Sequence, residues 1–112
     1  MTHNKSIRQE VIELETYKSN YIQKNYVEGK VIIITGASGK LTAKRAAEMG
    51  GKIVLAARSE EKLKETVAEI KAAGGEASYI VTDVAKKDDV FAMAKFAVDT
   101  YGRIDVLVNN AG

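Results

Sequence analysis

Residues 31–50, VIIITGASGKLTAKRAAEMG, join a β-branched run to a short glycine turn and then to an alanine-rich segment. A continuous apolar run of this kind is typical of a strand that is buried on both faces. The alanine-rich segment that opens at Gly39 has the composition of a helix. In open parallel sheets, ligands bind beyond the carboxyl end of the strands, so Gly36 stands where a backbone can approach a pyrophosphate closely.

The glycine spacing in this turn fits neither of two standard nucleotide patterns. A Walker A loop needs Gly-x-x-x-x-Gly-Lys-Ser/Thr, but Ile34 lies five positions before Gly39, and Leu41 follows Lys40. The dinucleotide pattern Gly-x-Gly-x-x-Gly fails as well, because residue 38 is serine and residue 41 is leucine. The spacing alone is therefore weak support for a nucleotide site.

The rest of the chain alternates between strand-like and helix-like segments. Ser59 is expected to cap the second helix, and Gly74 to close it. The predicted strands are residues 30–35, 52–57, 76–82 and 103–112, and the predicted helices are residues 39–51, 58–75 and 86–102. The helices carry apolar residues on one face, which are Leu63, Val67 and Ile70 in the second and Val90, Ala94, Ala97 and Tyr101 in the third.

This β-α-β-α-β-α-β order predicts an α/β fold. The short connections favour a parallel sheet with right-handed crossovers and helices on both faces. We therefore expect a Rossmann-type doubly wound sheet with strand order 3-2-1-4 over residues 27–112. A sheet that ends at its fourth strand exposes an edge and leaves part of its apolar faces without helices.

Residues 1–26 lie outside the alternating pattern. Their apolar side chains recur at helical spacing, at Ile7, Val11, Leu14, Tyr17 and Tyr21. This spacing favours an amphipathic helical extension that packs on the domain or on a second subunit. A partly ordered tail is the alternative interpretation.

Composition excludes several classes of protein. A chain of 112 residues with net charge +2 and interspersed charges gives no basis for nucleic-acid binding. The longest apolar run is far too short to span a membrane, and the first residues lack the apolar core of a signal peptide. The absence of cysteine suits a cytoplasmic protein. His3 is the single histidine and lies near a polar terminus, so no metal site is expected.

The end of the second predicted strand bears on the choice of cofactor. Dinucleotide folds recognise the adenosine ribose about twenty residues after the first glycine, where an acidic side chain accepts a hydrogen bond from the 2′-hydroxyl of NAD. Here the position is Ala57, followed by Arg58 and Ser59. A guanidinium pairs with a 2′-phosphate, so the sequence favours NADP over NAD, with Arg58 and Ser59 as candidate cofactor-binding residues. A solvated arginine at a helix start is the alternative for Arg58.

Four segments of the chain together resemble the short-chain dehydrogenase/reductase family. They are GKVIIITGAS (29–38), VLAARSEEKL (54–63), TDV (82–84) and GRIDVLVNNAG (102–112), and the resemblance spans about residues 27–112. It implies an NADP(H)-dependent oxidoreductase that transfers a hydride between nicotinamide and a small carbonyl or alcohol substrate. It also implies a homo-oligomer, either a dimer or a tetramer.

The resemblance also implies roles for individual residues. Asp83 would bind the adenine amino group, Val84 would line the adenine pocket, and Asn109 would tie neighbouring strands together. The first turn would contribute Gly36 as its first glycine, Ser38 as a hydroxyl donor and Gly39 as the glycine that opens the helix. The residues that would run beside the cofactor riboses are Asn110, Ala111 and Gly112, after a strand expected to be buried.

The chain departs from the family in its first turn. The family pattern is Thr-Gly-x-x-x-Gly-x-Gly, and inserting three residues after Ser38 restores it, with Gly39 as the last glycine. The middle glycine is therefore missing. Either the deletion is real, and the turn cannot wrap a pyrophosphate in the usual way, or the written sequence omits three residues.

The catalytic residues of the family fall after the fourth strand. The segment YVEGK, Tyr26–Lys30, has the family's Tyr-x-x-x-Lys spacing, but it precedes the first strand and contains a glycine. No catalytic residue is therefore assigned, and we expect a longer natural chain. The alternatives are a non-catalytic dinucleotide-binding or regulatory module, or a fragment that has lost binding.

Overall fold

The computed structural model describes residues 27–36 and 39–110. The expected N-terminal helix, Ser38, Ala111 and Gly112 lie outside these residues. The described part alternates strands and helices in the predicted order: β1 (Val31–Thr35), α2 (Lys40–Glu48), β2 (Lys52–Ala57), α3 (Glu60–Ala72), β3 (Glu76–Val81), α4 (Lys87–Tyr101) and β4 (Val106–Asn109).

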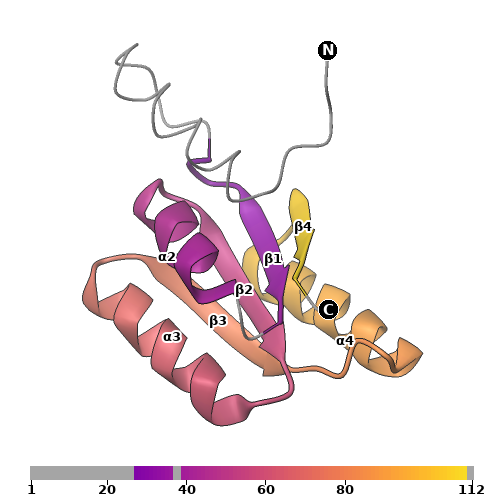
Figure 1. The fold of residues 1–112 in the computed structure, drawn as a ribbon. Helices are drawn as coiled ribbons and strands as arrows, with labels where there is room; N and C mark the ends of the chain where they lie inside the picture. The colour runs from indigo at the N-terminus through magenta and orange to yellow at the C-terminus, as the bar shows by residue number, and fades with distance from the viewer. Residues whose placement is uncertain (1–26, 37–38, 111–112) are drawn as a thin grey trace, which may run out of the picture.

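The strands form one parallel sheet with β1 and β2 at its centre. Its order is β3-β2-β1-β4, which confirms the predicted Rossmann-type topology (Figure 1). In the register, Ile33 of β1 lies between Val54 of β2 and Leu107 of β4. Because all strands are parallel, their carboxyl ends meet at one edge of the sheet.

Helices cover both faces of the sheet, as predicted. Figure 1 shows α2 and α3 on one face and α4 on the other. The sheet has a hydrophobic core on each face, and successive side chains of β1 point into them in turn. Ile32 and Ile34 face α2 and α3, whereas Ile33 faces α4. This division explains why the strand is apolar at every position from Val31 to Ile34.

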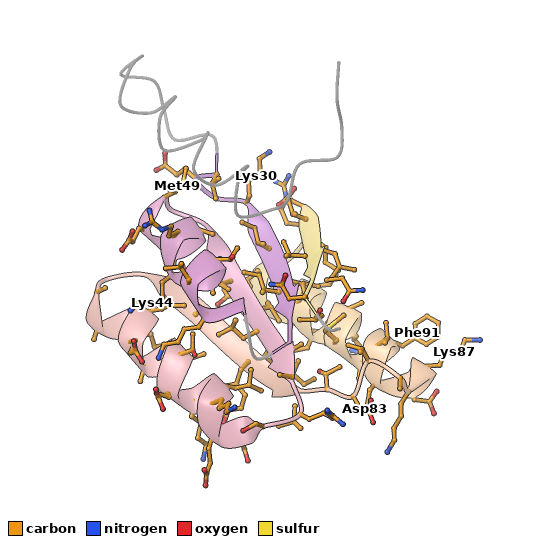
Figure 2. All side chains as sticks on the ribbon, in the orientation of Figure 1. Lys30, Lys44, Met49, Asp83, Lys87 and Phe91 are labelled. Carbon is orange, nitrogen blue, oxygen red and sulfur yellow. The ribbon has the colours of Figure 1, made fainter. Side chains whose placement is uncertain are left out.

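The buried stripe of α4 differs from the prediction. Ala97 is buried as expected, but Val90, Ala94 and Tyr101 are only half-buried, and Met93, which was not predicted, is buried. The helix is apolar at most positions, so its periodicity did not identify the buried face. Figure 2 shows Phe91 pointing away from the sheet, and 64% of this side chain is exposed.

The expectation of a buried fourth strand was wrong. Val108 is buried, but Val106 and Leu107 are 37% and 56% exposed. The reason is that β4 lies at the end of the sheet and pairs with β1 alone among the described strands. This is the exposed edge that a sheet ending at its fourth strand leaves.

Asp105 fixes the amino end of the β1–β4 pair. Its Oδ2 accepts a hydrogen bond from the backbone N–H of Val31 at 2.8 Å, and Nε of Arg103 donates to Oδ1 at 3.0 Å. The Val31 hydrogen bond, with Arg103 beside it, holds the pKa of Asp105 below its usual value. The central strand is thus anchored to a residue 74 positions later in the chain.

Two negative findings concern the described residues. In residues 27–36 and 39–110, none of the helices combines the length and apolar character that crossing a bilayer requires. The same residues contain no group of three or more side chains placed to hold a metal ion.

Candidate functional site

The carboxyl edge of the sheet brings together several of the residues predicted for the site. Figure 2 shows Asp83 at this end of the molecule, opposite Lys30 and Met49. Each strand is followed, directly or within two residues, by one of the predicted positions, which are Gly36, Arg58, Asp83 and Asn110. A ligand laid across this edge would meet all of them.

Hydrogen bonds hold the two described glycines of the first turn, Gly36 and Gly39. Gly36 has φ +89°, a backbone conformation that favours glycine. Its N–H donates to the carbonyl of Ala56 at 2.9 Å, and the N–H of Gly39 donates to the carbonyl of Gly36 at 3.4 Å. The chain therefore turns from β1 into α2 within four residues, from Gly36 to Gly39.

Gly39 lies in a space that admits no side chain. A Cβ at this position would lie 2.5 Å from Cγ2 of Ile34 and 2.9 Å from Nδ2 of Asn110. Glycine thus allows α2 to begin directly against the end of β1 and the side chain that follows β4.

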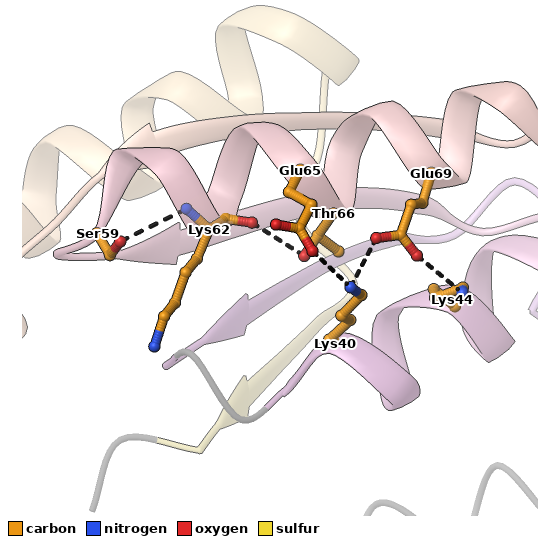
Figure 3. A network of polar contacts seen from close by, with 7 residues as sticks. All are labelled: Lys40, Lys44, Ser59, Lys62, Glu65, Thr66 and Glu69. Atoms are coloured by element: carbon orange, nitrogen blue, oxygen red, sulfur yellow. Dashed lines mark hydrogen bonds and ion pairs between the residues drawn. The ribbon is translucent and has the colours of Figure 1, made fainter.

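The N-termini of α2 and α3 differ at this edge. No side chain among the described residues caps α2, and its first turn holds no acidic residue. In α3, the Ser59 hydroxyl accepts a hydrogen bond from the N–H of Lys62 at 3.4 Å, and Glu60 and Glu61 follow (Figure 3). The first N–H groups of a helix lack intrahelical partners and attract anions, so α2 is the end suited to a phosphate.

A buried hydroxyl joins the ends of β1 and β4. Thr35 is 2% exposed, and its Oγ1 lies 3.1 Å from Oδ1 of Asn109, to which it donates. The same oxygen accepts a hydrogen bond from the N–H of Asn110 at 3.2 Å. Asn109 thus ties neighbouring strands as expected, and Asn110 is held beside the first turn.

The end of β3 presents a carboxylate beside an apolar side chain. The N–H of Asp83 donates to Oδ2 of Asp89 at 2.9 Å, and Oδ1 of Asp83 accepts from the N–H of Ala85 at 3.0 Å. Oδ2 of Asp83 has no partner within the described part of the chain. Val84 is 42% exposed. An acceptor next to an apolar surface is suited to an amino-substituted aromatic ring.

The end of β2 presents a cation. Arg58 is exposed, and its guanidinium forms no ion pair with the residues that the structure describes. The neighbouring carboxylate of Glu60 instead accepts a hydrogen bond from the Tyr79 hydroxyl at 2.9 Å, which raises the pKa of Tyr79. Arg58 is therefore available to an anionic ligand at this edge.

Sequence reasoning missed two residues that shape the site. Thr35 was assigned only to a strand, although a hydroxyl at the end of an apolar run suggests a polar contact. Asp89 was assigned only to a helix, although an acidic side chain in the first turn of the helix that follows Asp83 is well placed to accept a hydrogen bond from a backbone N–H. Each side chain holds the backbone N–H of a predicted site residue, Thr35 that of Asn110 and Asp89 that of Asp83.

These features fit a nicotinamide dinucleotide, the ligand that the fold implies. The uncapped end of α2 offers N–H groups to a pyrophosphate, and the positive φ of Gly36 lets the chain turn without a side chain there. Arg58 offers a cation at the position of the adenosine ribose.

Known proteins resemble this chain in both sequence and structure. The profile of the family described as short chain dehydrogenase matches residues 30–112. An uncharacterised oxidoreductase from Thermotoga maritima is 52% identical over 88 residues, which cover 76% of this chain and 34% of that protein.

Two solved structures share the fold and hold different cofactors. A metagenomic short-chain oxidoreductase in complex with NADP is 43% identical with a TM-score of 0.72, covering 77% of this chain and 40% of that one. A short-chain dehydrogenase/reductase from Burkholderia phymatum in complex with NAD is 38% identical with a TM-score of 0.70, covering 72% and 30%. The sequence matches to three uncharacterised oxidoreductases, that from Thermotoga maritima among them, cover only 25% to 36% of the length of those proteins.

Proposed function

Because this chain belongs to the short-chain dehydrogenase family, we propose that it forms the cofactor-binding part of an NADP(H)-dependent oxidoreductase. The intact protein would transfer a hydride between nicotinamide and a small carbonyl or alcohol substrate. We expect it to act in the cytoplasm as a homo-oligomer. The observation that carries the choice of NADP is Arg58, an exposed cation at the carboxyl end of β2.

Each residue at the carboxyl edge would contact one part of the cofactor. Arg58 would pair with the adenosine 2′-phosphate, with the Ser59 hydroxyl as a further donor. Asp83 would accept a hydrogen bond from the adenine amino group, and Val84 would pack against the ring. The first turn and α2 would face the pyrophosphate through Gly36, Ser38 and Gly39, and the riboses would lie along Asn110, Ala111 and Gly112.

The bound dinucleotide would supply the hydride chemistry, and the described residues would hold it in place. Thr35 fixes the backbone of Asn110, and Asp89 fixes that of Asp83, so both ends of the cofactor would meet a preformed surface. A surface that needs little ordering loses less free energy when the ligand binds.

The identity of residue 57 supports NADP over NAD. Ala57 stands at the end of β2 and cannot accept a hydrogen bond from a ribose 2′-hydroxyl. The relatives of known structure include both NADP and NAD complexes, so the preference proposed here depends on Arg58 and Ala57 themselves.

Replacing Arg58 tests the proposal. Arg58→Ala should weaken NADPH binding by about 10- to 100-fold, the effect of a lost charged hydrogen-bonding group. NADH binding should change by less than about threefold, because NADH has no 2′-phosphate. Titration of the reduced nicotinamide fluorescence measures both dissociation constants.

Lys71→Ala is the matched control, because it removes an exposed cation from the opposite end of α3. It should leave both dissociation constants unchanged. An equal loss of NADPH and NADH affinity in Arg58→Ala would contradict the proposed role, and failure of the parent chain to bind either dinucleotide would contradict the proposed function.

A further inference from the structure

We propose that Tyr79 is a positioning residue for cofactor choice, because its hydroxyl keeps the Glu60 carboxylate away from Arg58. The inference rests on the proposed function, and it adds a residue from inside β3 that lies outside the predicted site. Three observations carry it: the hydrogen bond between Tyr79 and Glu60, the packing of the Tyr79 ring, and the position of Glu60 two residues after Arg58.

The sequence places a carboxylate next to the cation that is proposed to bind the cofactor. Glu60 is the first residue of α3 and follows Arg58 by two positions. Both side chains are exposed and long, so they would pair if nothing else held them. A carboxylate paired with Arg58 would neutralise the guanidinium and would also repel a phosphate. An acidic residue at this position therefore works against an anion site unless its side chain is held elsewhere.

Tyr79 provides that hold. Its hydroxyl donates to Oε2 of Glu60 at 2.9 Å. In the register, Tyr79 pairs with Leu55 of β2, and its half-buried ring packs against the core on the face of the sheet that α3 covers. The hydrogen bond to Glu60 raises the pKa of Tyr79, so the phenol keeps its proton and remains a donor at neutral pH.

The rigidity of this donor explains why Glu60 lies with Tyr79 and not with a cation. A ring that is already held by packing loses little freedom when its hydroxyl binds a carboxylate, whereas an exposed ion pair must order two long side chains. Two cations compete for Glu60, namely Arg58 and, four residues further along α3, Lys64. Within the part of the chain that the structure describes, neither of them pairs with Glu60.

The hold on Glu60 determines how much positive charge the β2–α3 junction offers. With the carboxylate bound to Tyr79, the guanidinium of Arg58 keeps its charge for an anion. Without the hydroxyl, the carboxylate is free to turn toward Arg58. NADPH would then bind less tightly, because its 2′-phosphate would meet a paired cation and a nearby negative charge. NADH carries no phosphate there and would lose little.

Removing one oxygen atom tests the inference. Tyr79→Phe keeps the ring and its packing, and it should raise the NADPH dissociation constant about threefold to fivefold, within the range of one exposed ion pair. The NADH dissociation constant should change by less than about 1.5-fold. Titration of the reduced nicotinamide fluorescence on the full 112-residue chain measures both, and circular dichroism establishes that the variant is folded.

A double variant separates the proposed role from a structural one. Glu60→Gln removes the charge that the hydroxyl restrains, so adding Tyr79→Phe to Glu60→Gln should change NADPH binding by less than about 1.5-fold. If Tyr79→Phe weakens NADPH equally in both backgrounds, the hydroxyl acts by another route and the inference is overturned. Unchanged NADPH binding in Tyr79→Phe, or an equal loss for NADH, also overturns it.

Tyr101→Phe is the matched control. It too removes the hydroxyl of a half-buried tyrosine, one that lies 3.0 Å from Oγ of Ser78 at the C-terminal end of α4. Neither dissociation constant should change, because this end of α4 lies away from Arg58. A selective loss of NADPH affinity of the same size in Tyr101→Phe would count against a specific role for Tyr79.

Glu60→Asp provides a second test that leaves the Tyr79 ring untouched. The shorter side chain falls short of the Tyr79 hydroxyl but keeps a carboxylate beside Arg58. NADPH binding should therefore weaken about threefold to fivefold, as in Tyr79→Phe, and NADH binding should not. If Tyr79→Phe does not fold, this variant gives the result, and unchanged NADPH binding in it overturns the inference.

The outcome for the proposed function remains distinguishable. If Arg58→Ala weakens NADPH selectively while Tyr79→Phe and Glu60→Asp leave NADPH binding unchanged, the inference fails and the proposed function stands. If the parent chain binds neither dinucleotide, both fail.

Discussion

Two helices begin at the carboxyl edge of the sheet, and their N-termini are built in opposite ways. At α3, Ser59 caps the helix and Glu60 and Glu61 lie in its first turn. At α2, Gly39 supplies neither a cap nor a charge, and the described first turn has no acidic residue. The first end satisfies its own backbone groups and dipole, and the second leaves N–H groups for another partner.

The difference teaches that the two ends serve different purposes. A glycine at the N-cap costs a helix only a few tenths of a kcal/mol relative to Ser or Asp. At Gly39 it stands where a side chain would collide with Ile34 and Asn110.

The largest effect should come from adding a side chain at the uncapped end. Gly39→Ala places a methyl group against Cγ2 of Ile34, a residue in the core, so either α2 or β1 must move. We expect a loss of about 2 kcal/mol in the free energy of unfolding, the usual cost of overpacking a core. Urea denaturation followed by circular dichroism measures it.

Leu41→Ala is the control for that variant, because Leu41 is 48% exposed in the same first turn. It should change stability by no more than about 0.5 kcal/mol. Equal stabilities of Gly39→Ala and the parent chain would show that the close packing of Gly39 is not required.

A smaller effect should follow from removing the cap of α3. Ser59→Ala removes the acceptor of the Lys62 N–H and should cost about 1 kcal/mol of unfolding free energy. Ser59→Asp keeps an N-cap acceptor and should retain that stability, but its charge opposes a 2′-phosphate beside Arg58. Denaturation and NADPH titration of both variants separate the two roles, and full NADPH affinity in Ser59→Asp would contradict a 2′-phosphate at this junction.

The smallest effect should come from the ion pairs that join the two helices. Lys40, with Lys44, holds the pKa of Glu69 below its usual value. The resulting stabilisation is present above the unfolded-state pKa and is lost as the pH falls through the folded-state pKa of Glu69. Lys40→Gln should therefore lower stability slightly at pH 7 and have less effect below about pH 4.

Thermal melts at pH 7 and pH 3.5, in low salt and in 1 M sodium chloride, measure this effect. Salt should reduce the difference between Lys40→Gln and the parent chain, because exposed ion pairs are screened. Lys95→Gln, which breaks the exposed pair with Asp99 on α4, is the matched control. A difference that persists in high salt and at low pH would mean that Lys40 acts by packing.

The sequence predicted most of the fold because its local signals agree with each other. The apolar strands, Ser59 as a cap and Gly74 after α3 each mark a boundary that the structure confirms to within a few residues. The burial of α4 and β4 was not predicted correctly. The face that α4 buries depends on the sheet beneath it, and the exposure of Leu107 depends on which strands lie beside β4.

The placement of the candidate site residues at one edge of the sheet was predictable from the sequence, and the contacts that hold them there were not. Arg58 and Asp83 follow strands, and a parallel sheet brings strand ends together from whatever distance along the chain. The bonds from Thr35 to Asn109 and from Asp83 to Asp89 depend on register and side-chain direction. The hydrogen bond from the Gly39 N–H to the carbonyl of Gly36 lies in a turn three residues shorter than the family pattern, so the pattern did not predict it.

The hydrogen bond between Val31 and Asp105 can form only after the ribosome has added most of the chain. The two residues are 74 positions apart, so one side of β1 has no partner from β4 when β1 emerges. At 5–20 residues per second, a ribosome needs roughly 4 to 15 s to add the intervening chain. For that interval the edge of β1 that β4 later covers stays unpaired, because β2 pairs with the other edge of the strand.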